Sequence, residues 1–178
     1  LEGVHVWQYR DPAVLPDSYW KEALKRDGEH IDSLNALAVF NYKHKDFDTA
    51  LRYAKHAEKV ICKYNKHPQS GEIFFNLGLI YLSKDEYDTA YDYFYKSSWN
   101  MDYYSASMTH IAALDGMKKH FDRMLYHSQN ALKYNAENPI ASVYKAIAQY
   151  NVGNLNESED IIENILSKDP LNHFARYV

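Results

Sequence analysis

The segment KDFDTALRYAKHA (residues 45–57) is echoed forty residues later by DEYDTAYDYFYKS (residues 85–97). Two further segments of the same pattern follow at steps of 34 residues, KHFDRMLYHSQNA (119–131) and GNLNESEDIIENI (153–165). Self-similarity at a period of about 20 to 50 residues is typical of stacked supersecondary units. The sequence therefore predicts four copies of one structural unit.

A second periodic segment precedes each copy, and it is clearest between residues 74 and 94. In its first half, residues at i, i+3, i+4 and i+7 mark one face of a helix: Phe74, Leu77, Gly78 and Tyr81. After the polar turn SKDE the same face resumes from Tyr87 onward. Each unit is therefore expected to be two helices joined by a tight turn.

The order Phe74-x-x-Leu77-Gly78-x-x-Tyr81, followed by Ala90-x-x-x-Phe94, resembles the tetratricopeptide repeat, a helix-turn-helix unit of 34 residues. The resemblance covers about residues 31–172 and rests on four copies in phase. It implies an all-α fold, a right-handed α-solenoid of the tetratricopeptide-repeat type built from antiparallel helix pairs. An ordinary helical bundle is the alternative, and the regular phasing disfavours it.

The repeat pattern also predicts how the chain is divided. The forty-residue first step implies a second helix extended to about Ile61, followed by a loop that contains Pro68 and Gly71. The expected parts are a linker from an upstream domain (1–15), then a repeat domain (16–178) with a half-repeat cap (16–30), repeats at 31–70, 71–104, 105–138 and 139–172, and the start of a terminal helix (173–178).

Three stretches resemble a narrower group. They are YRDPAVLPDSYWKEALKRD (9–27), SGEIFFNLGLIYL (70–82) and FYKSSWN (94–100). They are similar to the repeat tail of bacterial proteins of unknown function, in which a β-sandwich similar to mutarotase-like sugar-binding domains precedes the repeats. That resemblance implies that any carbohydrate link resides mainly upstream of this chain.

Composition and motifs exclude several classes of function. The net charge is -4 with both signs mixed along the chain, which disfavours nucleic acid as a partner. The apolar runs are far shorter than the roughly 20 residues of a membrane-spanning helix. The single Cys62 suits a reducing compartment, so we expect a cytoplasmic location. Nine histidines without metal-ligand spacing, and no phosphate loop or nucleophile elbow, predict a protein that is not an enzyme and has no cofactor or metal.

The resemblance implies that the first helices of the repeats line a concave face. That face is more apolar than a solvated helix face should be, which is typical of a contact site. Its predicted partner-binding residues are Asn35, Val39, Tyr42, Lys43, Glu72, Phe75, Asn76, Leu79, His110, Tyr144, Ile147 and Tyr150.

Within this set we expect Asn35 and Asn76 to hold the backbone amides of a partner. Phe75, Tyr42 and Tyr150 are expected to act as aromatic anchors. Lys43 is the only clear base on the face, which disfavours capture of a peptide carboxyl terminus.

The sequence therefore predicts a non-catalytic scaffold for protein–protein or interdomain interaction that uses the concave face of the repeats. The expected partner is a protein or peptide segment, or an upstream domain of the same chain. One alternative is an accessory helical domain of a carbohydrate-active bacterial protein, packed against its sugar-binding or catalytic domain. Another is a structural spacer or a homodimer formed through the carboxyl end.

Overall fold

The structure is a computed structural model that describes residues 2–9, 15–63, 65 and 68–177. These residues form helices and no strand. The helices are α1 Glu2–Tyr9, α2 Pro16–Arg26, α3 Ile31–Lys43, α4 Phe47–Ile61, α5 Glu72–Ser83, α6 Tyr87–Ser97, α7 Met101–Met117, α8 Phe121–Tyr134, α9 Pro139–Asn151, α10 Leu155–Lys168 and the 3-10 helix η1 Ala175–Tyr177. The all-α prediction is confirmed for this part of the chain.

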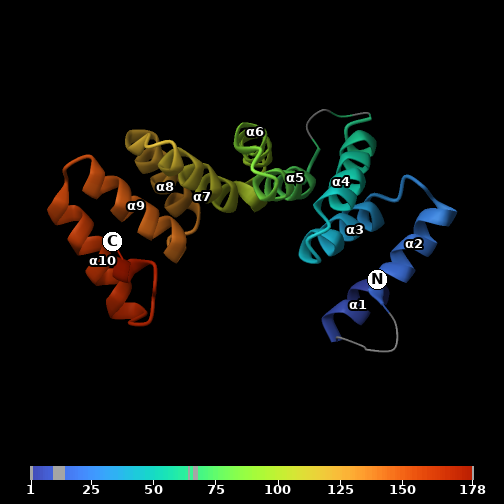
Figure 1. The fold of residues 1–178 in the computed structure, drawn as a ribbon, viewed down its shortest axis with the longest axis horizontal. Coiled ribbons are helices and arrows are strands. Elements are labelled where there is room, and N and C mark those ends of the chain that lie inside the picture. Colours follow the sequence, from blue (N-terminus) through green and yellow to red (C-terminus); the bar gives the residue numbers. More distant parts are fainter. Residues whose placement is uncertain (1, 10–14, 64, 66–67, 178) are drawn as a thin grey trace. The chain divides into compact units, whose positions relative to one another are not determined.

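The chain forms two compact units, Leu1–Ala90 and Tyr91–Val178, and the boundary falls inside α6. In unit 1, α1 packs on α2, α2 on α3, and α3 and α4 on each other and on α5. In unit 2, α7 packs on α8 and α9, α9 also packs on α8 and α10, and η1 packs on α10. Within unit 1 from α1 to α5, and within unit 2 from α7 to η1, helices that follow one another in sequence therefore pack together (Figure 1).

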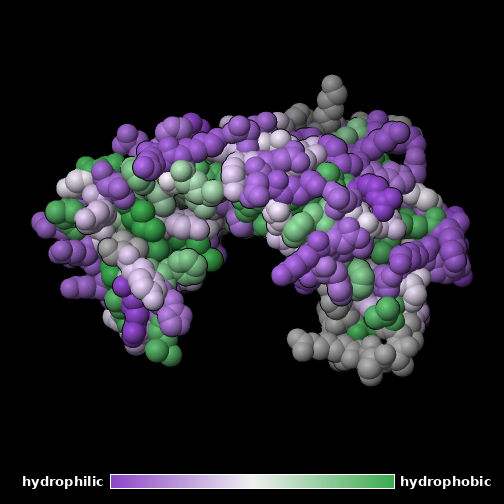
Figure 2. Space-filling model, in the orientation of Figure 1, coloured by the Kyte–Doolittle hydropathy of each residue, from purple (hydrophilic) through white to green (hydrophobic). Residues whose placement is uncertain are grey.

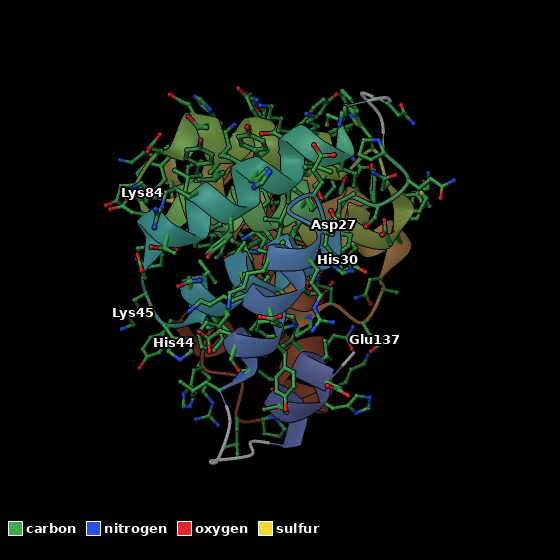
Figure 3. All side chains as sticks on the ribbon, turned by 90° about the vertical axis from the view of Figure 1, so that its right-hand side faces the viewer. Asp27, His30, His44, Lys45, Lys84 and Glu137 are labelled. Carbon is green, nitrogen blue, oxygen red and sulfur yellow. The ribbon has the colours of Figure 1, made fainter. Side chains whose placement is uncertain are left out.

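The same tight turn joins the helices of four hairpins. One residue in each turn has a left-handed backbone, with φ of 63° at Lys45, 60° at Asp85, 59° at Lys119 and 91° at Gly153. Lys45 stands at the α3–α4 turn, and Lys84 directly precedes Asp85 at the α5–α6 turn (Figure 3). The next residue donates its backbone N–H to a carbonyl five residues earlier: Asp46 to Asn41 (3.0 Å), Glu86 to Tyr81 (3.0 Å), His120 to Asp115 (2.9 Å) and Asn154 to Gln149 (2.9 Å). The four predicted helix pairs therefore have the same turn at equivalent positions of their sequences.

Helix ends follow the local sequence. Asp46 accepts a bond from Thr49 N (3.1 Å) at the start of α4, and Asn138 accepts one from Ala141 N (3.1 Å) at the start of α9. At the start of α3, His30 Nδ1 accepts a bond from Ser33 N at 3.2 Å (Figure 3). Such side-chain acceptors satisfy the orphan N–H groups of a helix start. As expected, α4 continues to Ile61.

Small residues allow close packing in the α3/α4 hairpin, where Ala38, Ala50, Ala54 and Ala57 are all buried. In the α7/α8 hairpin a buried Met124 occupies the place of Ala50. Space for this methionine comes from Gly116 on α7, where an added Cβ would lie 2.9 Å from Met124 Sδ. The small residue of this contact therefore lies on the second helix of the α3/α4 hairpin, at Ala50, but on the first helix of the α7/α8 hairpin, at Gly116.

The structure differs from the sequence prediction at both ends. Residues 2–9, expected as part of a linker, form α1, while residues 10–14 of that linker lie outside the described residues. Helix α1 packs on α2 because Gly3 is buried against Trp20, and a Cβ there would lie 2.6 Å from Trp20 Nε1. At the other end the expected terminal helix is a single 3-10 turn, whose start is capped by Asn172 Oδ1 accepting from Ala175 N (3.1 Å).

Candidate functional site

Unit 1 brings two of the predicted asparagines together. Asn35 lies on α3 and Asn76 on α5, and Asn76 Nδ2 donates a hydrogen bond of 2.8 Å to Asn35 Oδ1. A small recess beside this pair is lined by residues of the same two helices: Ala38, Val39, Tyr42, Asn76, Leu79 and Ile80. Five predicted residues, Asn35, Val39, Tyr42, Asn76 and Leu79, therefore gather at one place.

The asparagine pair keeps unused hydrogen-bonding capacity. Both side chains are half-buried. A side-chain amide has two N–H donors and a carbonyl acceptor. Within the described residues, the Asn35 amide nitrogen and the Asn76 carbonyl oxygen make no hydrogen bond. One donor and one acceptor therefore stand side by side, which is the complement of the C=O and N–H of a peptide backbone.

The other predicted residues of unit 1 surround the recess less closely. Lys43 is exposed in the last turn of α3, and Glu72 is half-buried in the first turn of α5. Phe75 is half-buried on α5 beside Asn76 but does not line the recess. Tyr42 is braced by Phe47, whose ring centroid lies 5.9 Å from its own. The aromatic lining of the recess thus comes from Tyr42.

In unit 2 the predicted residues have different surroundings. His110 stacks on the buried Phe94, with centroids 4.7 Å apart and the rings 7° from parallel, and burial lowers its pKa. Tyr144 and Ile147 pack against the buried cluster of Ala112, Met124 and Ala148, and burial raises the pKa of Tyr144. These three side chains are used for packing between helices.

Tyr150, the fourth predicted residue of unit 2, is 55% exposed. It lines a pocket with residues of α10. Unlike the residues of unit 1, the four in unit 2 do not converge on a shared recess among the described residues.

Sequence reasoning missed a buried polar pair in unit 2. His127 Nδ1 and Asp115 Oδ2 are 2.6 Å apart, and both side chains are almost fully buried. Arg123 Nε lies 3.5 Å from Asp115, and Arg123 Nη2 donates to Tyr91 Oη at 2.8 Å. Burial is the main cause of the raised pKa of Tyr91, and the Asp115 charge adds to it. The only available signal was an aspartate at the place where the second repeat has Tyr81.

Neither a metal-binding cluster nor a membrane-spanning helix occurs among the described residues. They contain no group of three or more His, Cys, Asp or Glu side chains able to hold a metal ion. None of their helices is long and apolar enough to cross a bilayer. The asparagine recess of unit 1 is therefore the strongest candidate site, and its chemistry is hydrogen bonding and apolar contact.

No protein-family model matches the chain. Solved structures are similar over nearly all of it. PilF of Pseudomonas aeruginosa is 17% identical with a TM-score of 0.82, and the match covers 98% of this chain and 77% of PilF. MamA is 16% identical with a TM-score of 0.78 and 94% of each chain covered.

YrrB is described as a tetratricopeptide-repeat protein with an unusual peptide-binding site. It is 16% identical to this chain with a TM-score of 0.72, and the match covers 88% of this chain and 77% of YrrB. At such identities the likeness concerns the fold and not the ligand. The chain therefore has the all-α repeat fold of tetratricopeptide-repeat proteins.

Proposed function

We propose that the chain is a non-catalytic interaction module that binds an extended peptide segment at the asparagine recess of unit 1. The paired amides of Asn35 and Asn76 carry this proposal. Their free N–H and C=O groups fit one peptide unit of an extended backbone, which presents both a donor and an acceptor. Val39, Tyr42 and Leu79 supply apolar area for the neighbouring side chain of the ligand.

Several observations support a peptide over other ligand classes. The described residues that line the recess are one amide, one tyrosine and apolar side chains with no positive charge, so a phosphate or carboxyl terminus finds little to bind there. YrrB, which has a similar fold, is described as having a peptide-binding site. The bound segment belongs either to another protein or to another domain of the same polypeptide.

Selection from a phage-displayed library of random short peptides tests this proposal. We expect enriched peptides whose affinity falls about tenfold when Asn35→Ala and Asn76→Ala are combined, since two backbone hydrogen bonds are lost. Asn130→Ala is the matched control, because among the described residues Asn130 Nδ2 bonds to the carbonyl of Tyr126 on its own helix (2.9 Å) and to no other group.

The aromatic part of the surface is tested separately. The change Tyr42→Ala should weaken the same peptides while the helical circular dichroism signal stays unchanged. Peptides that bind the asparagine double variant as well as the unchanged protein would place the binding site elsewhere.

A further inference from the structure

One face of α8 shows how this fold covers a helix. Phe121 and Leu125 of α8 pack against a buried cluster that contains Met124. From the other side, Tyr144 and Ile147 of α9 pack against the same cluster. A neighbouring amphipathic helix therefore closes this face of α8 with a stripe of apolar residues one turn apart.

The same positions recur on α10, 34 residues later, with a change in chemistry. Leu155, Ser158 and Glu159 stand where α8 has Phe121, Met124 and Leu125. They line a pocket together with Tyr150, Ile162 and Glu163. Within the described residues, α10 packs only on α9 and η1. Leu155 remains 50% exposed and Tyr150 55% exposed.

We propose that this surface, the α10 pocket, docks a basic amphipathic α-helix of a partner protein, seated on α10 as α9 is seated on α8. The pocket is defined by Tyr150, Leu155, Ser158, Glu159, Ile162 and Glu163. It does not overlap the asparagine recess, so the proposal is independent of the proposed function. In Figure 2, apolar and hydrophilic surface alternate over α9 and α10, at the left of the view.

The negative charge of the α10 pocket determines which kind of helix can dock there. On α8 the face is closed by apolar contact, whereas α10 carries a carboxylate at Glu159 and another at Glu163 on the wall of the pocket. Both are exposed. A lysine or arginine on the docked helix would lay its apolar stem in the pocket and its charge beside these carboxylates.

A second copy of the chain fits less well. An isologous pairing through α10 would bring Glu159 and Glu163 of one copy against the same residues of the other. Such facing like charges oppose association. A basic helix from a different protein meets no such repulsion.

A stapled peptide of residues 138–151 is the probe, because α9 is the helix that closes the equivalent face of α8. A hydrocarbon staple between positions 142 and 146 would keep this short peptide helical. The basic form carries Val143→Lys and Tyr150→Lys, and the acidic form carries Val143→Glu and Tyr150→Glu. At 100° per residue both positions flank the stripe of Ile140, Tyr144 and Ile147, which stays unchanged.

Fluorescence anisotropy with the unmodified chain should show the basic peptide binding about tenfold more tightly than the acidic one. Ile162→Asp should weaken the basic peptide about tenfold by placing a charge in the apolar floor. The double change Glu159→Lys with Glu163→Lys should reverse the preference between the two peptides.

Asp160→Lys is the matched control for either single change, since it alters the charge by the same amount as Glu159→Lys or Glu163→Lys, on the same helix and outside the pocket lining. Circular dichroism of each variant confirms that it is folded. Equal binding of the two peptides, or reversal by Asp160→Lys as well, would overturn the proposal. A concentration-dependent doubling of mass in sedimentation equilibrium that Ile162→Asp abolishes would assign the pocket to a second copy instead, and would also overturn it.

Discussion

The α3/α4 hairpin of unit 1 and the α7/α8 hairpin of unit 2 have the same turn but different cores. The first is filled by alanines and leucines, with Asn41 bonded to the carbonyl of Leu37 on its own helix (2.7 Å). The second places Asp115 at the position of Asn41 and pairs it with His127 across the two helices. The fold therefore accepts at this position either an amide bonded within its own helix or a polar pair that joins the two helices, provided that the polar groups are satisfied.

Among the substitutions that test this comparison, removal of Asp115 should cause the largest loss of stability. Asp115→Ala leaves His127 buried without its partner and should cost about 3 kcal/mol of unfolding free energy, in the range found for broken buried pairs. Asn41→Ala, at the equivalent place in the first hairpin, should cost about 1 kcal/mol or less, because one local hydrogen bond is lost. Urea denaturation of both variants provides the measurement. Equal losses would mean that the buried pair contributes no more than the local bond.

Substitution of Met124 should cause the next largest loss of stability. Met124→Ala gives the second hairpin the alanine of the first, but leaves a cavity beside Gly116, so we expect a loss of about 2–3 kcal/mol. Gly116→Ala in that background should recover about 1 kcal/mol, because the Cβ no longer meets Met124 Sδ and alanine favours a helix. With Met124 present, the same glycine change should bring no such gain. If the effects of the two substitutions on the unfolding free energy were simply additive, the sizes of residues 116 and 124 would not depend on each other across the helix pair.

The pH dependence associated with His110 should be the smallest of the three effects. Burial lowers its pKa below the ordinary 6.5, so the folded protein binds fewer protons than the unfolded chain. Stability should therefore fall as the pH drops below about 6.5, until the folded-state pKa is reached. His110→Phe keeps a ring stacked on Phe94 and should flatten this part of the stability curve. The exposed His56 provides a control variant, His56→Phe, which should leave the curve unchanged.

Most of the fold was predictable because the repeat signal lies in local spacing. Small and apolar residues at fixed intervals identified the four hairpins, and the extra residues of the first repeat predicted the extension of α4 to Ile61. Helix α1 was missed because it stands outside the repeats, and the close approach of Gly3 to Trp20 in its packing on α2 leaves no periodic trace.

The candidate site was predictable only in part. Asn35 and Asn76 were both named, and they meet because the same face of successive first helices comes together in unit 1. Tyr144 and Ile147 were assigned to the same predicted face, but the size of Met124 gives them a packing partner that a repeat pattern does not reveal. The Asp115–His127 pair was hidden because its two members lie on different helices, and neither matches a motif.

The recurring turn has a consequence for how such a chain can change in length. Within each hairpin, one left-handed residue and one backbone hydrogen bond fix the number of residues between the helices. The additional residues of the first repeat lie instead at its end, where α4 continues to Ile61 and residues 62–71 separate it from α5. We therefore expect insertions to be tolerated at the joints between hairpins and to disrupt the turns within them, so the hairpin rather than the single helix is the unit in which such a chain can gain or lose length.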